Sequence, residues 1–179
     1  MKLKQPFIIQ VVGYKNSGKT TLVCHLIEVA RNLGLNSATI KHHGHGGKPT
    51  ANENTDSFHH KQAGSIMAGV EGDGELLLSI TQSSWTLGQI LKFYELVDID
   101  LIFIEGYKHE NYPKIVLLSK EEDLSLLSEI SNVYAIISSF DSQIKNNHVP
   151  MFLRNEQSLI DKWFRNLLYN KEIDLKRKR

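Results

Sequence analysis

The 179-residue chain contains one cysteine, Cys24, and lacks any run of eighteen apolar residues. A lone cysteine excludes an internal disulfide and fits a reducing compartment, so we expect a cytoplasmic protein. The missing apolar run argues against a membrane-spanning helix, and the N-terminus has no signal-peptide pattern. The formal net charge of +1 provides no overall field for nucleic acid. We therefore expect neither a membrane nor a nucleic acid as partner.

Positive charge is concentrated only near the C-terminus, where residues 176–179 read Lys-Arg-Lys-Arg. We interpret 171–179 as a basic, solvated tail, with contact to an acidic partner as the alternative. The remaining composition, 41% hydrophobic and 23% charged, is ordinary for a globular protein. The length suits one domain with a sizeable core, so residues 1–179 are predicted to form a single domain.

The most specific pattern lies at residues 13–20, Gly-Tyr-Lys-Asn-Ser-Gly-Lys-Thr, which has the G-x-x-x-x-G-K-[ST] spacing of a phosphate-binding P-loop. An apolar, β-branched stretch at 7–12 precedes it, and apolar residues with helical spacing follow, as the motif requires. Lys19 would reach the β- and γ-phosphates of a nucleotide, and the Thr20 hydroxyl would hold Mg²⁺. The predicted nucleotide-binding residues are Gly13, Lys15, Asn16, Ser17, Gly18, Lys19, Thr20 and Thr21.

Strand patterns alternate with helix patterns along the chain, which predicts an α/β fold with a mostly parallel sheet. With the P-loop, this indicates a P-loop NTPase-like three-layer sandwich. Residues 65–80 form two further strand patterns that meet at Gly72-Asp73-Gly74, which predicts a β-hairpin extension. Strands are expected at 7–12, 37–41, 101–104, 114–118 and 133–138, and helices after the P-loop, from 55 to 63, from 86, over 121–129 and from about 155.

A second chemical element follows the apolar strand 101–104, which ends at Glu105. A P-loop protein needs a carboxylate at a neighbouring strand end, either to contact Mg²⁺ through water or to orient the attacking water. Glu105 is therefore the predicted catalytic residue, and a solvated strand end is the alternative. Asp100 begins the same strand and is expected at the opposite edge of the sheet. The predicted metal-side residues are Thr20, Glu105 and Asp56, where Asp56 has a helix N-cap as its favoured alternative.

Five of the eight histidines lie within residues 42–60: His42, His43, His45, His59 and His60. Three interpretations stay open, namely a transition-metal site, a loop that engages an anionic ligand or partner, and solvated loop histidines. Residues 42–55 form a polar, glycine-rich loop that is longer than usual and predicts a functional, mobile segment. The guanine-specific motif Asn-Lys-x-Asp is absent, so motifs alone do not separate ATP from GTP.

Taken together, these motifs resemble the molybdopterin-guanine dinucleotide biosynthesis protein B (MobB) family. The resemblance spans about residues 6–140 and rests on the order and spacing of several segments. These are 13–22, Ile40-Lys41-His42-His43, Thr55-Asp56-Ser57 with Ala63-Gly64, Phe103-Ile104-Glu105-Gly106-Tyr107-Lys108, and Pro113-Lys114-Ile115. The combination is much more specific than the P-loop by itself.

The resemblance implies a GTP-binding protein of the SIMIBI type, a class of P-loop proteins that usually act as homodimers. It implies GTP and Mg²⁺ as cofactors, weak GTP hydrolysis, and a role in assisting the molybdopterin guanylyltransferase that joins GMP to molybdopterin. Lys41, His42, His43 and His45 are implied as a ligand- or partner-facing loop. In one departure, the position five residues before the P-loop lysine, where several SIMIBI relatives place a signature lysine, is Tyr14 here.

Two other functions are compatible with the residues. A small-molecule kinase would use the same P-loop and bind a phosphate acceptor in the loop of residues 42–60. A metal-delivery GTPase would use the histidines of that loop as ligands. The sequence therefore predicts a GTP-binding accessory protein of molybdenum cofactor biosynthesis, at most a slow GTPase, with these two alternatives.

Overall fold

The computed structural model describes residues 5–42, 55–141 and 149–177. The chain divides into two compact units, Met1–Gly44 with Phe93–Arg179, and His45–Lys92. The first unit contains the main sheet and the P-loop, and the second contains a β-hairpin with a short helix. The predicted loop at 42–55 lies outside the described residues except at its two ends, His42 and Thr55.

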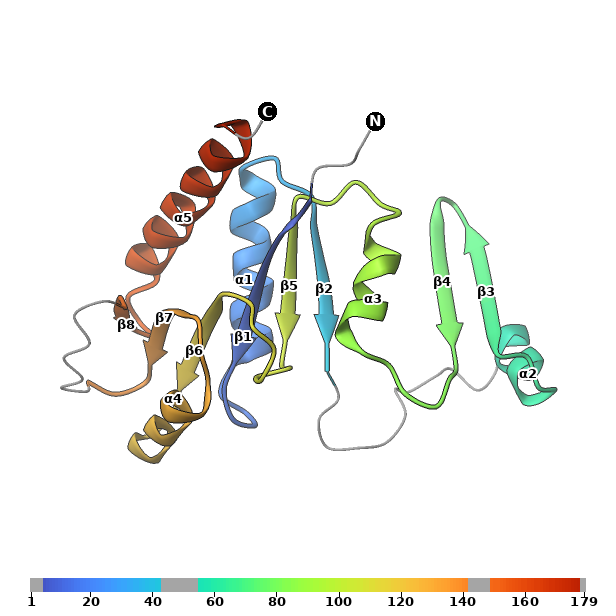
Figure 1. Ribbon diagram of the computed structural model, residues 1–179, viewed down its shortest axis with the longest axis horizontal. Helices are drawn as coiled ribbons and strands as arrows, with labels where there is room; N and C mark the ends of the chain where they lie inside the picture. The colour runs from blue at the N-terminus through green and yellow to red at the C-terminus, as the bar shows by residue number, and fades with distance from the viewer. Residues whose placement is uncertain (1–4, 43–54, 142–148, 178–179) are drawn as a thin grey trace. The chain divides into compact units, whose positions relative to one another are not determined.

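A six-stranded parallel sheet forms the centre of the first unit (Figure 1). The strand order is β2-β5-β1-β6-β7-β8, and every neighbouring pair is parallel. Strands β2 and β5 lie on one side of β1, and the later strands β6, β7 and β8 lie on the other side. The strand order therefore reverses at β1, and α/β sheets bind ligands at the carboxyl ends of the strands where such a reversal occurs. The strands are β1 (Phe7–Val12), β2 (Ser37–Lys41), β5 (Leu101–Glu105), β6 (Lys114–Leu118), β7 (Val133–Ser138) and β8 (Met151–Leu153).

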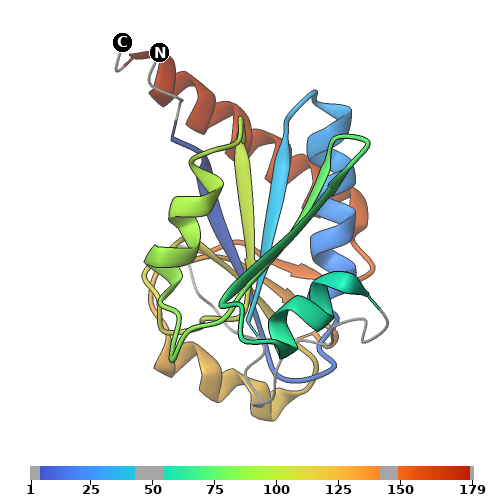
Figure 2. The same ribbon diagram turned by 90° about the vertical axis from the view of Figure 1, so that its right-hand side faces the viewer.

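Helices cover both faces of this sheet, which gives three layers. One face packs against α1 (Lys19–Asn32) and α5 (Gln157–Arg177), through a core that includes Ile9, Val11 and Phe164. The other face packs against the 3₁₀ helix η1 (Glu121–Ser125) and α4 (Leu126–Glu129), through a smaller core that includes Val12, Val116 and Leu126. Figure 2 shows α1 alongside the strands. The predicted P-loop NTPase-like fold is confirmed, with a wholly parallel main sheet.

The strands read as nearly continuous apolar runs because both of their faces are covered. In β5, four of five residues are buried, and all five residues of β6 are. Strand β8, only three residues long, was not predicted, and α5 begins two residues later than expected. Among the described residues, no helix is both long and apolar enough to cross a membrane.

The second unit contains α2 (Asp56–Gln62) and the hairpin of β3 (Met67–Gly72) and β4 (Glu75–Ile80). The turn residues Asp73 (φ 51°) and Gly74 (φ 79°) are both left-handed, as a type I′ turn requires. The predicted hairpin is therefore confirmed. The Lys61 ammonium group ties α2 to the hairpin by donating to the hydroxyls of Ser79 (2.8 Å) and Thr81 (2.6 Å).

Side-chain hydrogen bonds cap the first turns of α2 and of the helix that follows the hairpin. The Thr86 hydroxyl accepts from the Gln89 amide (3.2 Å) and Gln89 accepts from the Thr86 amide (3.0 Å), ahead of α3 (Leu87–Tyr94). At α2 the cap is Thr55, whose hydroxyl accepts from the Phe58 amide (3.4 Å). Asp56 is the first helical residue, so its interpretation as the N-cap is wrong. A carboxylate in the first turn still complements the helix dipole.

Two buried polar side chains hold the loop that follows β5. The Gln10 side-chain amide donates to the carbonyls of Gly106 (3.1 Å) and Tyr107 (2.7 Å), and its oxygen accepts from the Tyr112 amide (3.3 Å). The Lys114 ammonium group donates to the Tyr112 carbonyl (3.1 Å). Because both side chains are fully buried, these bonds offset the cost of removing them from water. They fix the backbone at the end of β5, where Glu105 lies.

Candidate functional site

The loop between β1 and α1 has the tight curvature of a P-loop. Asn16 (φ 61°) and Gly18 (φ 85°) both have left-handed backbones, a conformation that makes anion-binding nests from successive N–H groups. At Gly13, a Cβ atom would lie 2.6 Å from Ser17 Oγ and 2.8 Å from the Leu117 carbonyl oxygen. Only glycine fits there, so the first glycine of the motif is required by packing.

Ser17 is the buried member of this loop, with 1% of its surface exposed. Its hydroxyl is buried and has no hydrogen-bond partner within the part of the chain that the structure describes. A buried, unpartnered hydroxyl is costly unless a ligand satisfies it. Lys15, Asn16 and Thr21 are exposed beside it. The loop therefore offers polar groups at the carboxyl end of β1.

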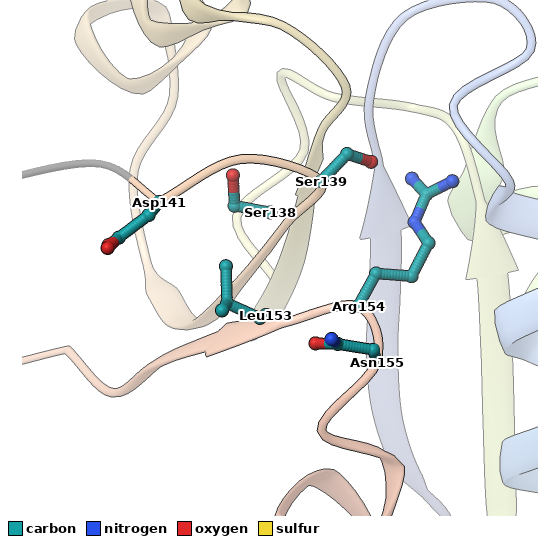
Figure 3. Close-up of a pocket in the computed structure, with 6 residues that line it drawn as sticks. All are labelled: Ser138, Ser139, Asp141, Leu153, Arg154 and Asn155. Carbon is teal, nitrogen blue, oxygen red and sulfur yellow. The ribbon is translucent and has the colours of Figure 1, made fainter.

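Arg154 reaches the same loop from the edge of the sheet that β8 forms (Figure 3). It directly follows β8, and its guanidinium donates to the Ser17 carbonyl (2.6 Å). The contact joins residues 137 positions apart, and a Cβ atom at Gly18 would lie 3.3 Å from this guanidinium. Arg154 is not predicted from the sequence, because no local pattern around it indicates a role.

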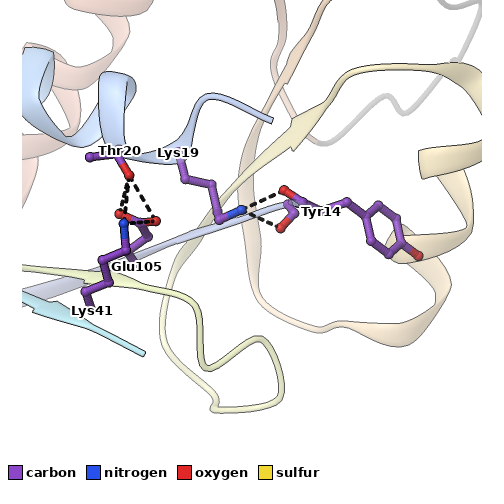
Figure 4. Close-up of polar contacts among 6 residues, drawn as sticks. Tyr14, Lys19, Thr20, Lys41 and Glu105 are labelled. Carbon is purple, nitrogen blue, oxygen red and sulfur yellow. Dashed lines mark hydrogen bonds and ion pairs between the residues drawn. The ribbon is translucent and has the colours of Figure 1, made fainter. Parts of the chain in front are cut away.

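Lys19 folds back over the loop (Figure 4). Its ammonium group donates to the carbonyls of Gly13 (2.9 Å) and Tyr14 (2.6 Å). Burial lowers the pKa of Lys19 below its ordinary value of 10.5, the Glu105 charge raises it, and the Lys41 charge lowers it. The lysine is thus a partly desolvated cation at the mouth of the loop, where it would meet a phosphate.

Thr20, Glu105 and Lys41 form a polar cluster next to Lys19 (Figure 4). The Thr20 hydroxyl donates to the Glu105 carboxylate at 2.9 and 3.1 Å. The Lys41 ammonium group lies 3.1 Å from Glu105 Oε1 and donates to Thr20 Oγ1 at 3.1 Å. Lys41 and Glu105 are direct neighbours in the parallel register of β2 and β5. Because the Glu105 side chain is only 12% exposed and hydrogen-bonded, it is not a solvated strand end.

The arrangement fits a magnesium nucleotide. Mg²⁺ prefers hard oxygen ligands and is usually held by one or two protein oxygens together with phosphates. The Thr20 hydroxyl and the Glu105 carboxylate are oxygen donors in direct contact, and Lys41 shows that the pair attracts a cation. The oxygens of Thr20 and Glu105 and the curled loop lie at the same carboxyl edge of the sheet.

The remaining predicted residues are less informative. His42 donates its backbone N–H to the Glu105 carbonyl (2.9 Å), and its ring lies 4.3 Å from the Tyr107 ring. Asp56 belongs to the second unit, so the structure does not place it relative to the P-loop. His43 and His45 lie outside the described residues, and within those residues no cluster of three His, Cys, Asp or Glu side chains could hold a metal ion.

Residues 8–139 match the family model for molybdopterin guanine dinucleotide synthesis protein B. The chain belongs to this family. A probable molybdopterin-guanine dinucleotide biosynthesis adapter protein of Bacillus subtilis is 37% identical over 163 residues, which cover 90% of this chain and 94% of the relative. The crystal structure of Bacillus subtilis MobB superposes with a TM-score of 0.75 at 38% identity, covering 86% of this chain and 93% of that one.

The crystal structure of a MobB homologue from Bacillus stearothermophilus also has a TM-score of 0.75, at 32% identity, and covers 91% of this chain and 98% of its own. Both TM-scores support the fold described above. The family resemblance noted in the sequence is confirmed, because the matched segment contains the P-loop, Lys41 and Glu105.

Proposed function

We propose that this MobB-family chain is a GTP-binding adapter of molybdenum cofactor biosynthesis. It binds GTP with Mg²⁺ at residues 13–21, hydrolyses it slowly, and assists the guanylyltransferase that joins GMP to molybdopterin. Family membership and the adapter names of its relatives support the biosynthetic role. The geometry of the P-loop supports the nucleotide.

The proposed contacts to phosphate and to Mg²⁺ come from different residues of the site. The curled backbone of 13–18 surrounds a phosphate, and Lys19 moves its charge from the Gly13 and Tyr14 carbonyls to the β- and γ-phosphates. Thr20 and Glu105 supply the oxygens for Mg²⁺, with Glu105 contacting either the ion or its water. When bound, Mg²⁺ neutralises charge that develops on the phosphates.

One observation supports this proposal more than any other, the contact of the Thr20 hydroxyl with the Glu105 carboxylate at 2.9 Å. These residues are 85 positions apart, and they meet because α1 starts where β1 ends and β5 is the strand beside β1. A strand–turn–helix that binds no ligand would not need a partly buried carboxylate such as Glu105 in contact with the hydroxyl of Thr20.

Titration calorimetry with GTP and with ATP, each with and without Mg²⁺, tests the proposal. We expect saturable GTP binding that Mg²⁺ strengthens, and weaker binding of ATP. If neither nucleotide binds, the P-loop assignment is wrong. If ATP binds better and a phosphate acceptor is consumed stoichiometrically, the chain is a kinase. The metal-delivery alternative depends on the histidines of residues 42–60, and it stays a prediction that dialysis against Zn²⁺ or Ni²⁺ would test.

Replacing Lys41 with methionine should lower the Mg²⁺ concentration needed for half-maximal nucleotide binding. The ammonium group lies 3.1 Å from both Thr20 Oγ1 and Glu105 Oε1, so it competes with Mg²⁺ for the same oxygens. The Lys41 side chain is 60% exposed, and exposed ion pairs contribute at most about 1 kcal/mol, so the change should not exceed about fivefold.

The measurement is a Mg²⁺ titration at a fixed concentration of fluorescent GTP. Lys92→Met, at an exposed lysine of α3, is the matched control and should leave the titration curve in place. If Lys41→Met needs the same or more Mg²⁺, Lys41 does not compete for the Thr20 and Glu105 oxygens.

We further propose that the chain acts as a homodimer and that the hairpin contributes to the interface. The hairpin exposes large apolar side chains along both strands, and a two-stranded ribbon is marginal without further packing. The exposed residues include Met67, Val70, Leu76, Leu77 and Leu78, with exposed fractions between 45% and 63%.

Replacing Leu77 with glutamate should weaken the dimer by at least about 30-fold. Leu77 faces Val70 across the hairpin, and both are exposed, so a charge there would meet the partner's apolar surface. Loss of a central interface residue costs about 2 kcal/mol or more. Sedimentation equilibrium measures the effect, with Leu159→Glu, an exposed leucine of α5, as control. Wild-type association of the Leu77 variant would place the interface elsewhere.

A further inference from the structure

A pocket opens at the carboxyl ends of β7 and β8 (Figure 3). Its volume, about 450 Å³, falls within the range of about 300–1,000 Å³ that is typical of small-molecule sites. Because the sheet is parallel, the pocket shares its edge with the P-loop. It is lined by Ser138, Ser139, Asp141, Leu153, Arg154 and Asn155.

The pocket wall is directly connected to the phosphate-binding loop through Arg154. Its guanidinium group donates to the Ser17 carbonyl at 2.6 Å, while the residue itself lines the pocket. In Figure 3 the Arg154 side chain and Asp141 lie at opposite ends of the labelled row, with Leu153 between them. A nucleotide whose phosphates lie on residues 13–20 therefore has this pocket beside it, with apolar surface from Leu153 for a planar ring.

The structure holds Asp141 in place through the turn that precedes it. The Ser138 hydroxyl donates to the Phe140 carbonyl (2.7 Å) and accepts from the Phe140 amide (3.1 Å). Ser138 is fully buried, so this turn is anchored to the end of β7. The anchored turn brings the Asp141 side chain to the pocket lining, where its carboxylate is exposed to a ligand.

A second acid near this edge, Asp123, is already engaged in hydrogen bonds within the protein. Asp123, which follows β6, is 2% exposed, and its carboxylate accepts from the amides of Ser119 (2.7 Å) and Lys120 (3.3 Å). These bonds stabilise the turn after β6 and direct the carboxylate into the protein. Asp123 therefore has a structural role, and Asp141 is the carboxylate that lines the pocket.

We propose that this pocket receives the guanine base and that the Asp141 carboxylate reads it, an inference that rests on the proposed nucleotide binding at the P-loop. A carboxylate only accepts hydrogen bonds at neutral pH, and guanine presents two adjacent donors, N1–H and the N2 amino group. Adenine presents a lone pair at N1 and would face the carboxylate with an acceptor. Asp141 thus supplies the base specificity that no Asn-Lys-x-Asp motif encodes in this chain.

Replacing Asp141 with asparagine tests the proposal, with xanthosine triphosphate (XTP) as the probe. Xanthine has a carbonyl where guanine has the N2 amino group, so it pairs with a side chain that offers both a donor and an acceptor. Wild-type protein should prefer GTP to XTP. The Asp141→Asn variant should lose about 10- to 100-fold in GTP affinity, as expected for charge-assisted bonds, and gain affinity for XTP. Glu122→Gln, at an exposed acid of η1, should change neither affinity.

Calorimetry with GTP and XTP on the three proteins separates the outcomes. A switch from GTP to XTP in Asp141→Asn alone supports the proposal. If the wild type binds GTP and Asp141→Asn binds both nucleotides as the wild type does, the base-reading role is wrong while the proposed function stands. Loss of GTP without a gain of XTP also overturns direct reading of the base. If the wild type does not bind GTP, both proposals fail.

Discussion

Replacing Lys19 with alanine should lower the affinity for GTP by about 10- to 150-fold and leave the thermal unfolding transition nearly unchanged. A charge-assisted contact to phosphate contributes about 1.5–3 kcal/mol, which corresponds to this range. The lysine makes hydrogen bonds only to the Gly13 and Tyr14 carbonyls, at the mouth of the loop, among the contacts of the described residues. Those carbonyls can bond to water in its absence, so little folding free energy depends on the side chain.

Titration calorimetry with Mg²⁺-GTP measures the affinity, and calorimetric unfolding checks that the variant is folded. Lys162→Ala, at an exposed lysine of α5, removes the same charge away from the loop and should bind GTP normally. Unchanged GTP affinity in Lys19→Ala would remove the basis for a phosphate site at residues 13–20.

The second large effect is expected at Glu105. Glu105→Gln should lower the rate of GTP hydrolysis by about 100-fold, the lower part of the range for groups that position or activate a nucleophile. The glutamine keeps the shape of the side chain and still accepts from the Thr20 hydroxyl, but it loses the charge that pairs with Lys41 and that would face Mg²⁺ in the proposed complex. At saturating Mg²⁺ the GTP affinity should stay within about threefold, because Lys19 and the loop would supply most of the proposed phosphate contacts.

Phosphate release under single-turnover conditions measures hydrolysis, and calorimetry measures binding in the same preparation. The matched control is Glu129→Gln, since Glu129 is an exposed carboxylate paired with Lys108 on the surface. A hydrolysis rate equal to the wild type in Glu105→Gln would limit Glu105 to organising the start of α1 and the end of β2.

Much of this fold follows from local patterns. The strands at 7–12, 37–41, 114–118 and 133–138 are the ones that apolar runs predict, because a buried parallel sheet needs little more than such runs. The hairpin turn follows from Asp73-Gly74, and the cap of α3 from Thr86 and Gln89. These features depend on residues a few positions apart. The P-loop has the same local character.

The parts that were missed depend on which strands become neighbours. Lys41 and Glu105 form an ion pair because β2 and β5 are adjacent and parallel, with these two residues side by side. The sequence of neither strand predicts that the two strands are neighbours or in which register they pair. Arg154 reaches Ser17 only because β8 closes the far edge of the sheet, and β8 itself is too short for an apolar period to reveal it.

The central position of β1 also determines when this site can assemble during synthesis. β1 ends at Val12, but its two neighbours in the sheet, β5 and β6, begin only at Leu101 and Lys114. At about 5–20 residues per second, the ribosome needs about 5–20 s to supply β5, and β1 has neither sheet neighbour until then. The polar residue Gln10 breaks the apolar run of β1, which lowers the tendency of the unpaired strand to aggregate during this interval. Once β5 is in place, the Gln10 side-chain amide donates to carbonyls of the loop that follows β5. No nascent chain that ends before β6 can hold the P-loop between both of its supporting strands.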